Sequence, residues 1–113
     1  MRGQRRTLNA MRANLHETYG DLWRKVQAHH SPTPEDLAEV WSATITTALE
    51  CRAAVSAMYA AAGTSSLYVD HPIERAHRDI HAVMQHIILQ PLWLEEAGRV
   101  KLGLEPTNPL FAV

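Results

Sequence analysis

The residues of this sequence best suited to chemistry gather between positions 67 and 91. Four of the seven histidines lie there with two arginines and three acidic residues: His71, His77, His81, His86, Arg75, Arg78, Asp70, Glu74 and Asp79. Histidine changes its charge near neutral pH, so it can accept or donate a proton in a reaction. Arginine suits phosphate, because its planar guanidinium group donates paired hydrogen bonds. We therefore expect any functional site to lie in this stretch.

The element that would position these residues is a helix beginning at Pro72. Proline fits the first helical position, because the N–H group that it lacks would have no partner there. Glu74 falls in the first turn, where the helix dipole favours a carboxylate. Apolar residues then recur at intervals of three and four, as on the buried face of a helix: Ile73, Ala76, Ile80, Val83, Met84 and Ile87.

The charged residues of this helix have a structural interpretation beside the chemical one. Glu74 and Arg78 are four positions apart, as are Arg75 and Asp79, so each pair can form an ion pair along the helix surface. Such exposed pairs contribute little to stability. On spacing alone, these pairs explain the two arginines as well as a bound phosphate would.

The sequence favours neither a metal site nor a catalytic nucleophile. His77 and His81 lie one helical turn apart, a spacing that can hold a metal ion. No Glu follows His77 as in the HExxH pattern, and no third ligand is evident, so we predict no metal site. The single cysteine, Cys51, lies inside an alanine-rich helical run with no base nearby in the sequence.

The same stretch resembles a known protein family. The segment GTSSLY, followed by HPIERAHRDIHAVMQH, is similar to the C-terminal helical domain of the acyl-CoA dehydrogenase superfamily. More narrowly, it resembles the two-component, reduced-flavin-dependent monooxygenases with that fold. Their Gly-Ser-rich turn and Tyr precede a Pro-(hydrophobic)-(Glu/Gln)-Arg-x-x-Arg-Asp-x-His-Ala run. The matching positions are Gly63, Ser65, Ser66, Tyr68, Pro72, Glu74, Arg75, Arg78, Asp79, His81 and Ala82.

This resemblance implies roles for individual residues. His81 would face the flavin and hydrogen-bond its oxygen adduct, or move a proton to or from it. Arg75 and Arg78 would contact flavin phosphate, or pair with carboxylates across a subunit interface. The structural alternative for His81 is a ring whose hydrogen bonds are satisfied by a backbone carbonyl or by a nearby acidic or amide side chain.

The turn before the helix carries the other implied contacts. Ser65 and Ser66 would bind the cofactor, because successive backbone N–H groups of a turn can face an anionic oxygen. Tyr68 and His77 would contact the substrate. On the residues alone, the turn is better explained as a plain helix end and linker, and Tyr68 as a buried aromatic residue.

Length and composition limit the remaining possibilities. The chain has 113 residues, enough for one domain with a modest core. Its net charge of −1 supplies no field that would attract nucleic acid. No apolar run reaches the roughly 18 residues that span a bilayer. A lone cysteine fits the reducing cytoplasm. We therefore expect a cytoplasmic protein that binds neither nucleic acid nor membrane.

The sequence predicts an all-α fold, an antiparallel bundle of three long helices. Thr33 suits the cap that begins the second helix, and Gly63 suits its end. Pro91 is expected to kink the third helix, because proline removes a backbone hydrogen bond. The tail, with Leu110 and Phe111, is expected to lie as a strap over a groove. The expected ranges are 7–29, 34–62 and 72–102 for the helices and 103–113 for the tail.

The resembled domain has four long helices and follows two further domains. A missing helix would leave an apolar groove, and large apolar patches are rare on monomers. We therefore expect a homo-oligomer or docking on the missing upstream domains, with a flavin reductase as a further partner.

The resemblance implies a flavin-dependent oxidoreductase that uses FMN or FAD. We prefer a reduced-flavin-dependent monooxygenase acting on a small organic substrate. One alternative is an acyl-CoA dehydrogenase-type domain, for which Glu74 and Glu95 are the only placeholders for the base. The other is a helical dimerisation or interaction module without chemistry.

Overall fold

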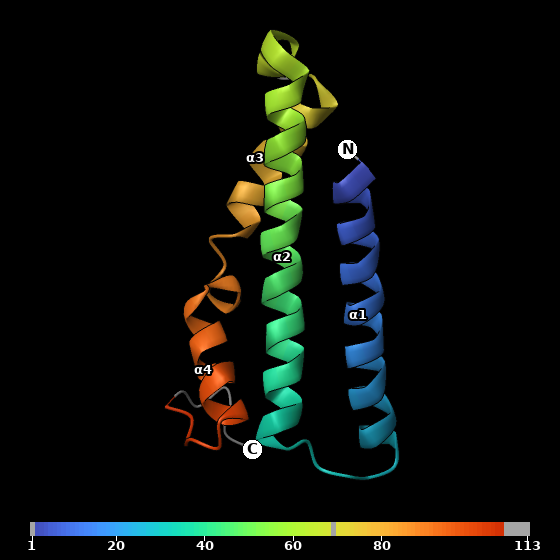
Figure 1. Cartoon of the computed structure of the whole chain (residues 1–113), viewed down its shortest axis with the longest axis vertical. Coiled ribbons are helices and arrows are strands. Elements are labelled where there is room, and N and C mark those ends of the chain that lie inside the picture. The colour runs from blue at the N-terminus through green and yellow to red at the C-terminus, as the bar shows by residue number, and fades with distance from the viewer. Residues whose placement is uncertain (1, 69, 108–113) are drawn as a thin grey trace.

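The computed structural model describes residues 2–68 and 70–107 as a layer of helices measuring 51 × 26 × 22 Å. The central helix, α2, runs antiparallel to α1 on one side and to α3 and α4 on the other (Figure 1). No strand occurs in the described ranges, so the all-α class is confirmed. The elements are α1 (Arg2–Gln27), α2 (Pro34–Ala62), η1 (Gly63–Leu67), α3 (Pro72–Val83), η2 (Ile87–Leu89) and α4 (Leu92–Lys101).

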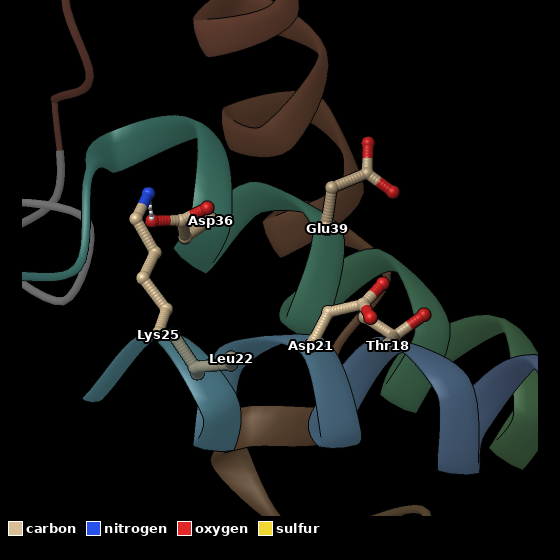
Figure 2. Close-up of a pocket in the computed structure, with 6 residues that line it drawn as sticks. All are labelled: Thr18, Asp21, Leu22, Lys25, Asp36 and Glu39. Carbon is tan, nitrogen blue, oxygen red and sulfur yellow. Dashed lines mark hydrogen bonds and ion pairs between the residues drawn. The ribbon is translucent and has the colours of Figure 1, made fainter. Parts of the chain in front are cut away.

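Two ends of this layer are distinguished below. The base comprises residues 18–27, 33–45 and 92–107, and the upper end comprises residues 52–68 and 70–83. At the base, α1 and α2 enclose a pocket of about 220 Å³. Its lining residues come from both helices (Figure 2): Thr18, Asp21, Leu22, Lys25, Asp36 and Glu39.

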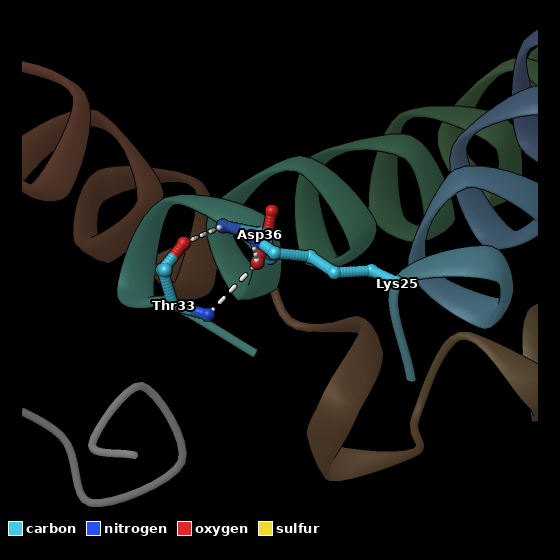
Figure 3. Close-up of polar contacts among 3 residues, drawn as sticks. All are labelled: Lys25, Thr33 and Asp36. Atoms are coloured by element: carbon cyan, nitrogen blue, oxygen red, sulfur yellow. Dashed lines mark hydrogen bonds and ion pairs between the residues drawn. The ribbon is translucent and has the colours of Figure 1, made fainter. Parts of the chain in front are cut away.

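The start of α2 is fixed as the sequence predicts. The Thr33 hydroxyl accepts a hydrogen bond from the Asp36 N–H (3.2 Å), and the Asp36 carboxylate accepts one from the Thr33 N–H (2.8 Å; Figure 3). These two bonds form a capping box, which supplies partners for N–H groups that lack one inside the helix. Lys25 of α1 donates to the same carboxylate at 2.5 Å and ties the two helices together.

These contacts set the charge state of Asp36. The hydrogen bond from Lys25, followed by that from the Thr33 backbone, lowers the pKa of the Asp36 carboxyl, although burial opposes them. Donors that bind the ionised form favour it over the protonated form. The charged carboxylate therefore stabilises the fold.

The core lies in the base, where α4 packs on the first half of α2. Ile45 is fully buried, and Trp93 and Ala97 pack against it from α4. The other residues of this cluster are Ala38 and Val100, with Trp41, Leu49 and Leu94 packed against it. By contrast, none of the described residues of α3 is buried. The part of the fold that excludes water best is therefore at the opposite end from His77 and His81.

The structure differs from expectation in its third helix. Instead of one helix over 72–102, α3 ends at Val83 and α4 begins at Leu92. Gln90 is extended, with φ −71° and ψ 135°, because a residue before proline is disfavoured in the helical region. Pro91 is helical, with φ −56°, so it starts α4 instead of bending a continuous helix.

Side chains satisfy the backbone across this break. His86 accepts a hydrogen bond from the Ile88 N–H at 3.2 Å and so caps the short η2 segment. The Gln90 amide donates to the carbonyl of Met84 at 3.2 Å. Trp93 donates its indole N–H to the Ile87 carbonyl. The local sequence thus provides partners that a broken helix would otherwise lack.

The first helix and the tail also differ in extent from expectation. α1 begins at Arg2 instead of Thr7, and the Thr7 hydroxyl donates to the Gly3 carbonyl at 3.0 Å. The tail folds back on α4, where Glu96 accepts hydrogen bonds from the backbone N–H (2.8 Å) and hydroxyl of Thr107. The predicted contacts of Leu110 and Phe111 lie outside the described residues.

Candidate functional site

Three aromatic rings from two helices meet at the upper end of the layer, and we call them the histidine column: Tyr59 of α2 with His77 and His81 of α3. The rings of Tyr59 and His77 are nearly parallel, with centroids 4.0 Å apart and an angle of 19° between their planes. The rings of His77 and His81 are 4.4 Å apart and inclined by 42°. The column forms because His77 and His81 lie one turn apart on a helix that packs against α2.

The backbone fixes the orientation of His81. Its Nδ1 atom lies 2.8 Å from the carbonyl oxygen of His77. A carbonyl oxygen only accepts hydrogen bonds, so Nδ1 must carry a hydrogen. In neutral His81 the lone pair is then on Nε2, at the other edge of an exposed ring. That atom can accept a hydrogen bond or a proton from a ligand.

The two arginines of α3 occupy its exposed surface. Arg75 lies 3.7 Å from Asp79, and Arg78 lies 3.6 Å from Glu74, as the spacing predicts. The side chain of Glu74 is only 18% exposed, and its Oε2 atom is buried without a hydrogen-bond partner. The arginines are held loosely enough to bind another anion.

The structure separates the turn from His81. Gly63 ends α2 with φ 66°, a conformation that favours glycine, as predicted. The Ser65 hydroxyl donates to the Ala62 carbonyl at 2.9 Å, while the side chain of Ser66 lies outside the described residues. His81 lies nine residues after Pro72, which in a helix is about 14 Å along the axis. Tyr68 is 72% exposed, so it is not a buried aromatic residue.

An apolar pocket of about 290 Å³ lies where α2 ends and α3 begins. Its walls are Met58, Ala61, Ala62, His71 and Ile73, and they include neither His81 nor the arginines. The predicted site residues therefore share one helix but do not surround this cavity. His81 and both arginines face outward, so any ligand between them needs a second wall.

The remaining histidines of the stretch have structural roles. His71 accepts a hydrogen bond from the Ile73 N–H at 3.2 Å and caps α3, directly before Pro72. His86 does the same for η2, a role that the sequence did not reveal because the break in the helix was not expected. Tyr59 was also missed as a site residue. Its contact with His77 depends on how α2 and α3 align, which sequence spacing within one helix does not specify.

Acidic groups elsewhere do not form a metal centre. In the described part of the chain, no three side chains among His, Cys, Asp and Glu are placed to hold an ion. The base pocket has three carboxylates, but each is paired with a cation: Asp21 with Arg24, Asp36 with Lys25, and Glu39 with Lys101. Among the residues that the structure describes, no helix is long and apolar enough to cross a membrane.

Comparison with known proteins identifies the family. Residues 4–91 match the family described as acyl-CoA dehydrogenase, C-terminal domain. The chain is also 30% identical, over 107 residues, to a pigment production hydroxylase of Rhodococcus erythropolis. That alignment covers 94% of this chain and 27% of the hydroxylase, so the chain spans about a quarter of that relative. No solved structure matches the chain. The resemblance inferred from the motif is confirmed, and the chain belongs to the acyl-CoA dehydrogenase C-terminal domain family.

Proposed function

We propose that this chain serves as the C-terminal helical domain of a flavin-dependent monooxygenase that acts on a small organic substrate. Its family membership and its similarity to a hydroxylase support this assignment. The observation that carries it is the geometry of His81. Its ring is anchored at Nδ1 and exposed, so Nε2 is available to a ligand.

The residues of α3 fit a flavin in their chemistry. Arg78 and Arg75 offer guanidinium groups that suit a phosphate. Both arginine side chains are exposed, and their ion pairs are long: 3.7 Å from Arg75 to the exposed Asp79, and 3.6 Å from Arg78 to the largely buried Glu74. The flavin, FMN or FAD, would supply the redox chemistry. This chain would contribute a charged surface and the Nε2 atom of His81, which accepts a proton or a hydrogen bond. Ser65, Ser66, Tyr68 and His77 remain predicted contacts.

The exposed surface of α3 indicates that a partner is needed to complete the site. A wall opposite α3 would come from a second copy or from domains upstream of this one, and a separate reductase would supply reduced flavin. The expected cytoplasmic location stays a prediction. The chain's residues favour the acyl-CoA dehydrogenase alternative less, because the side chain of Glu74 is largely buried and Glu95 belongs to α4, beyond the break.

Flavin titration tests the proposal directly. Oxidised and anaerobically reduced FMN and FAD are titrated into the chain, and into a version extended by any upstream coding sequence, while flavin fluorescence or absorbance is followed. We expect saturable binding that weakens about tenfold or more in Arg78→Gln, since a charge-assisted bond to phosphate is lost. Arg24→Gln, at the base, is the matched control. Absence of binding by both versions would contradict the proposal.

A second candidate function is a helical interaction module without chemistry. Large apolar side chains are exposed along α1 and at both ends of α3, including Trp23 (62%), Leu67 (66%) and Ile87 (67%). Exposed apolar groups at this density favour association. Light scattering at micromolar concentration tests this function, since a purely monomeric chain would exclude self-association. A dimer that binds no flavin in either version would favour the module over the enzyme domain.

A further inference from the structure

The histidine column links α2 to the Nε2 atom of the exposed His81 ring. Tyr59 contacts the ring of His77, and His77 contacts His81 twice, through its ring and through its carbonyl oxygen. Two contacts of different direction restrict both side-chain torsions of His81, because rotation about either torsion breaks at least one of them. Contacts between rings, stacked for Tyr59 and His77 and tilted for His77 and His81, stabilise a pair beyond the area they bury.

We propose that Tyr59 and His77 are positioning residues that hold neutral His81 in its Nδ1–H tautomer, with the lone pair of Nε2 facing outward. The second nitrogen of a neutral imidazole is fixed by what the first one does. Since the His77 carbonyl requires a hydrogen on Nδ1, none remains for Nε2. Tyr59 contributes by keeping the His77 ring, and with it the contact surface for His81, against α2.

This assignment restricts the ligand that His81 can meet. Neutral His81 accepts a hydrogen at Nε2 but has none to donate there, so the facing atom must bring its own hydrogen as an O–H or N–H group. That consequence rests on the proposed function, because it takes a ligand to be present at the site. The tautomer itself does not, and it is measurable in the chain without flavin.

Two other histidines of the same chain provide internal controls. His71 and His86 each accept a hydrogen bond from a backbone N–H at Nδ1, so their neutral forms must carry the hydrogen on Nε2. The structure thus assigns opposite tautomers to His81 and to this pair. All three tautomers can be measured in a single spectrum.

The experiment is a two-bond proton–nitrogen NMR correlation on the full chain labelled with ¹⁵N-histidine, at a pH where histidine is neutral and with no flavin added. For His81 we expect a protonated-type shift at Nδ1 and an unprotonated-type shift at Nε2. His71 and His86 should show the reverse. Assignment uses His→Gln variants, one residue at a time. Wild-type His81 with its hydrogen on Nε2 would overturn the proposal without any further variant.

Variants of Tyr59 then separate the ring from its hydroxyl. Tyr59→Phe keeps the aromatic ring, so the tautomer ratio of His81 should remain as in the wild type. Tyr59→Leu removes the ring, and we expect the ratio to fall about two- to tenfold toward the Nε2–H form, as loss of one ring contact implies. Unchanged signals of His71 and His86 show that the helices are intact.

The outcomes distinguish this proposal from the proposed function. An unchanged ratio in Tyr59→Leu, or an equal loss in Tyr59→Phe, would show that the ring contact does not position His81. Failure of flavin titration with the tautomers as assigned would contradict the flavin enzyme and leave the positioning role intact. Flavin binding by a chain whose His81 carries its hydrogen on Nε2 would support the flavin enzyme and contradict the positioning role.

Discussion

The base and the upper end of the layer are built by different interactions. The base has a fully buried isoleucine, Ile45, and a helix start capped by Thr33 and bound by Lys25. The upper end has rings in contact, exposed arginines and a buried oxygen of Glu74 without a partner. Tight packing and satisfied polar groups stabilise a fold, whereas open and incompletely paired groups are suited to binding. Stability is therefore concentrated in the base, whereas the proposed ligand contacts lie at the less tightly packed upper end.

The largest expected effect comes from breaking the base. Ile45→Ala should lower the free energy of unfolding by about 2–5 kcal/mol, because it removes a fully buried side chain and leaves a cavity. Val83→Ala, at the exposed end of α3, is the control and should change stability by less than about 0.5 kcal/mol. Urea unfolding measured by circular dichroism gives both values. Similar losses of unfolding free energy in the two variants would show that stability is not concentrated in the base.

The next effect comes from an exposed residue near the chain's C-terminal end. Thr107→Val removes the hydroxyl group that donates a hydrogen bond to the Glu96 carboxylate. Glu96 is only 8% exposed. A buried carboxylate that loses a donor is destabilised, and we expect a loss of about 1–3 kcal/mol in the same unfolding assay. Thr64→Val, on the exposed η1 segment, is the matched control. If both threonine variants unfold at the same urea concentration, the contact between Thr107 and Glu96 does not stabilise the base.

The sequence predicts one side of this comparison better than the other. The bounds of α2, the cap at Thr33 and the end at Gly63 follow from local rules, because each depends on neighbours within a few residues. The ion pairs of α3 follow in the same way from helical spacing.

What the sequence does not predict depends on contacts between elements. The break before Pro91 has a local signal, because Gln90 precedes a proline. Its early start after Val83 has none: Trp93 and Gln90 bond carbonyls of Ile87 and Met84 there, and the spacing pattern of a single helix does not show these contacts. Tyr59 joined the site only because α2 and α3 align at that height. No sequence pattern marks Glu96 as a hydrogen-bond acceptor for the tail, because that contact depends on how the tail folds back on α4. Membership in the family was recognisable because its motif is local to one turn and one helix.

A smaller effect, dependent on pH, sharpens the description of the base. Asp36→Asn should cost about 1 kcal/mol at neutral pH, since it weakens a cap and removes the charge that Lys25 binds. The pKa of Asp36 is lowered in the fold, so its contribution is complete above the ordinary value of 3.8 and is lost as the pH falls through the lower folded value.

The difference between wild type and Asp36→Asn should therefore narrow as the pH is lowered from neutrality to below 3.8. Urea midpoints measured across this range report it. Asp21→Asn is the control, because its pair with Arg24 is exposed on both sides and should add little at any pH. A difference that stays constant with pH would show that Asp36 acts only through hydrogen bonds that its neutral form also makes.

The smallest effect on stability is expected at the upper end, in Arg75→Gln. The guanidinium group of Arg75 is 3.7 Å from Asp79, and both side chains are largely exposed, so the loss should be below about 0.5 kcal/mol. Arg78→Gln should be nearly as mild, although its partner Glu74 is mostly buried and loses a nearby cation. A protein that kept these arginines for stability would show the opposite order, with losses comparable to that of Thr107→Val. If both variants keep the stability of the wild type but bind flavin more weakly, the two arginines serve ligand binding. Their ion pairs would then contribute little to the fold, and their guanidinium groups would be available to a phosphate.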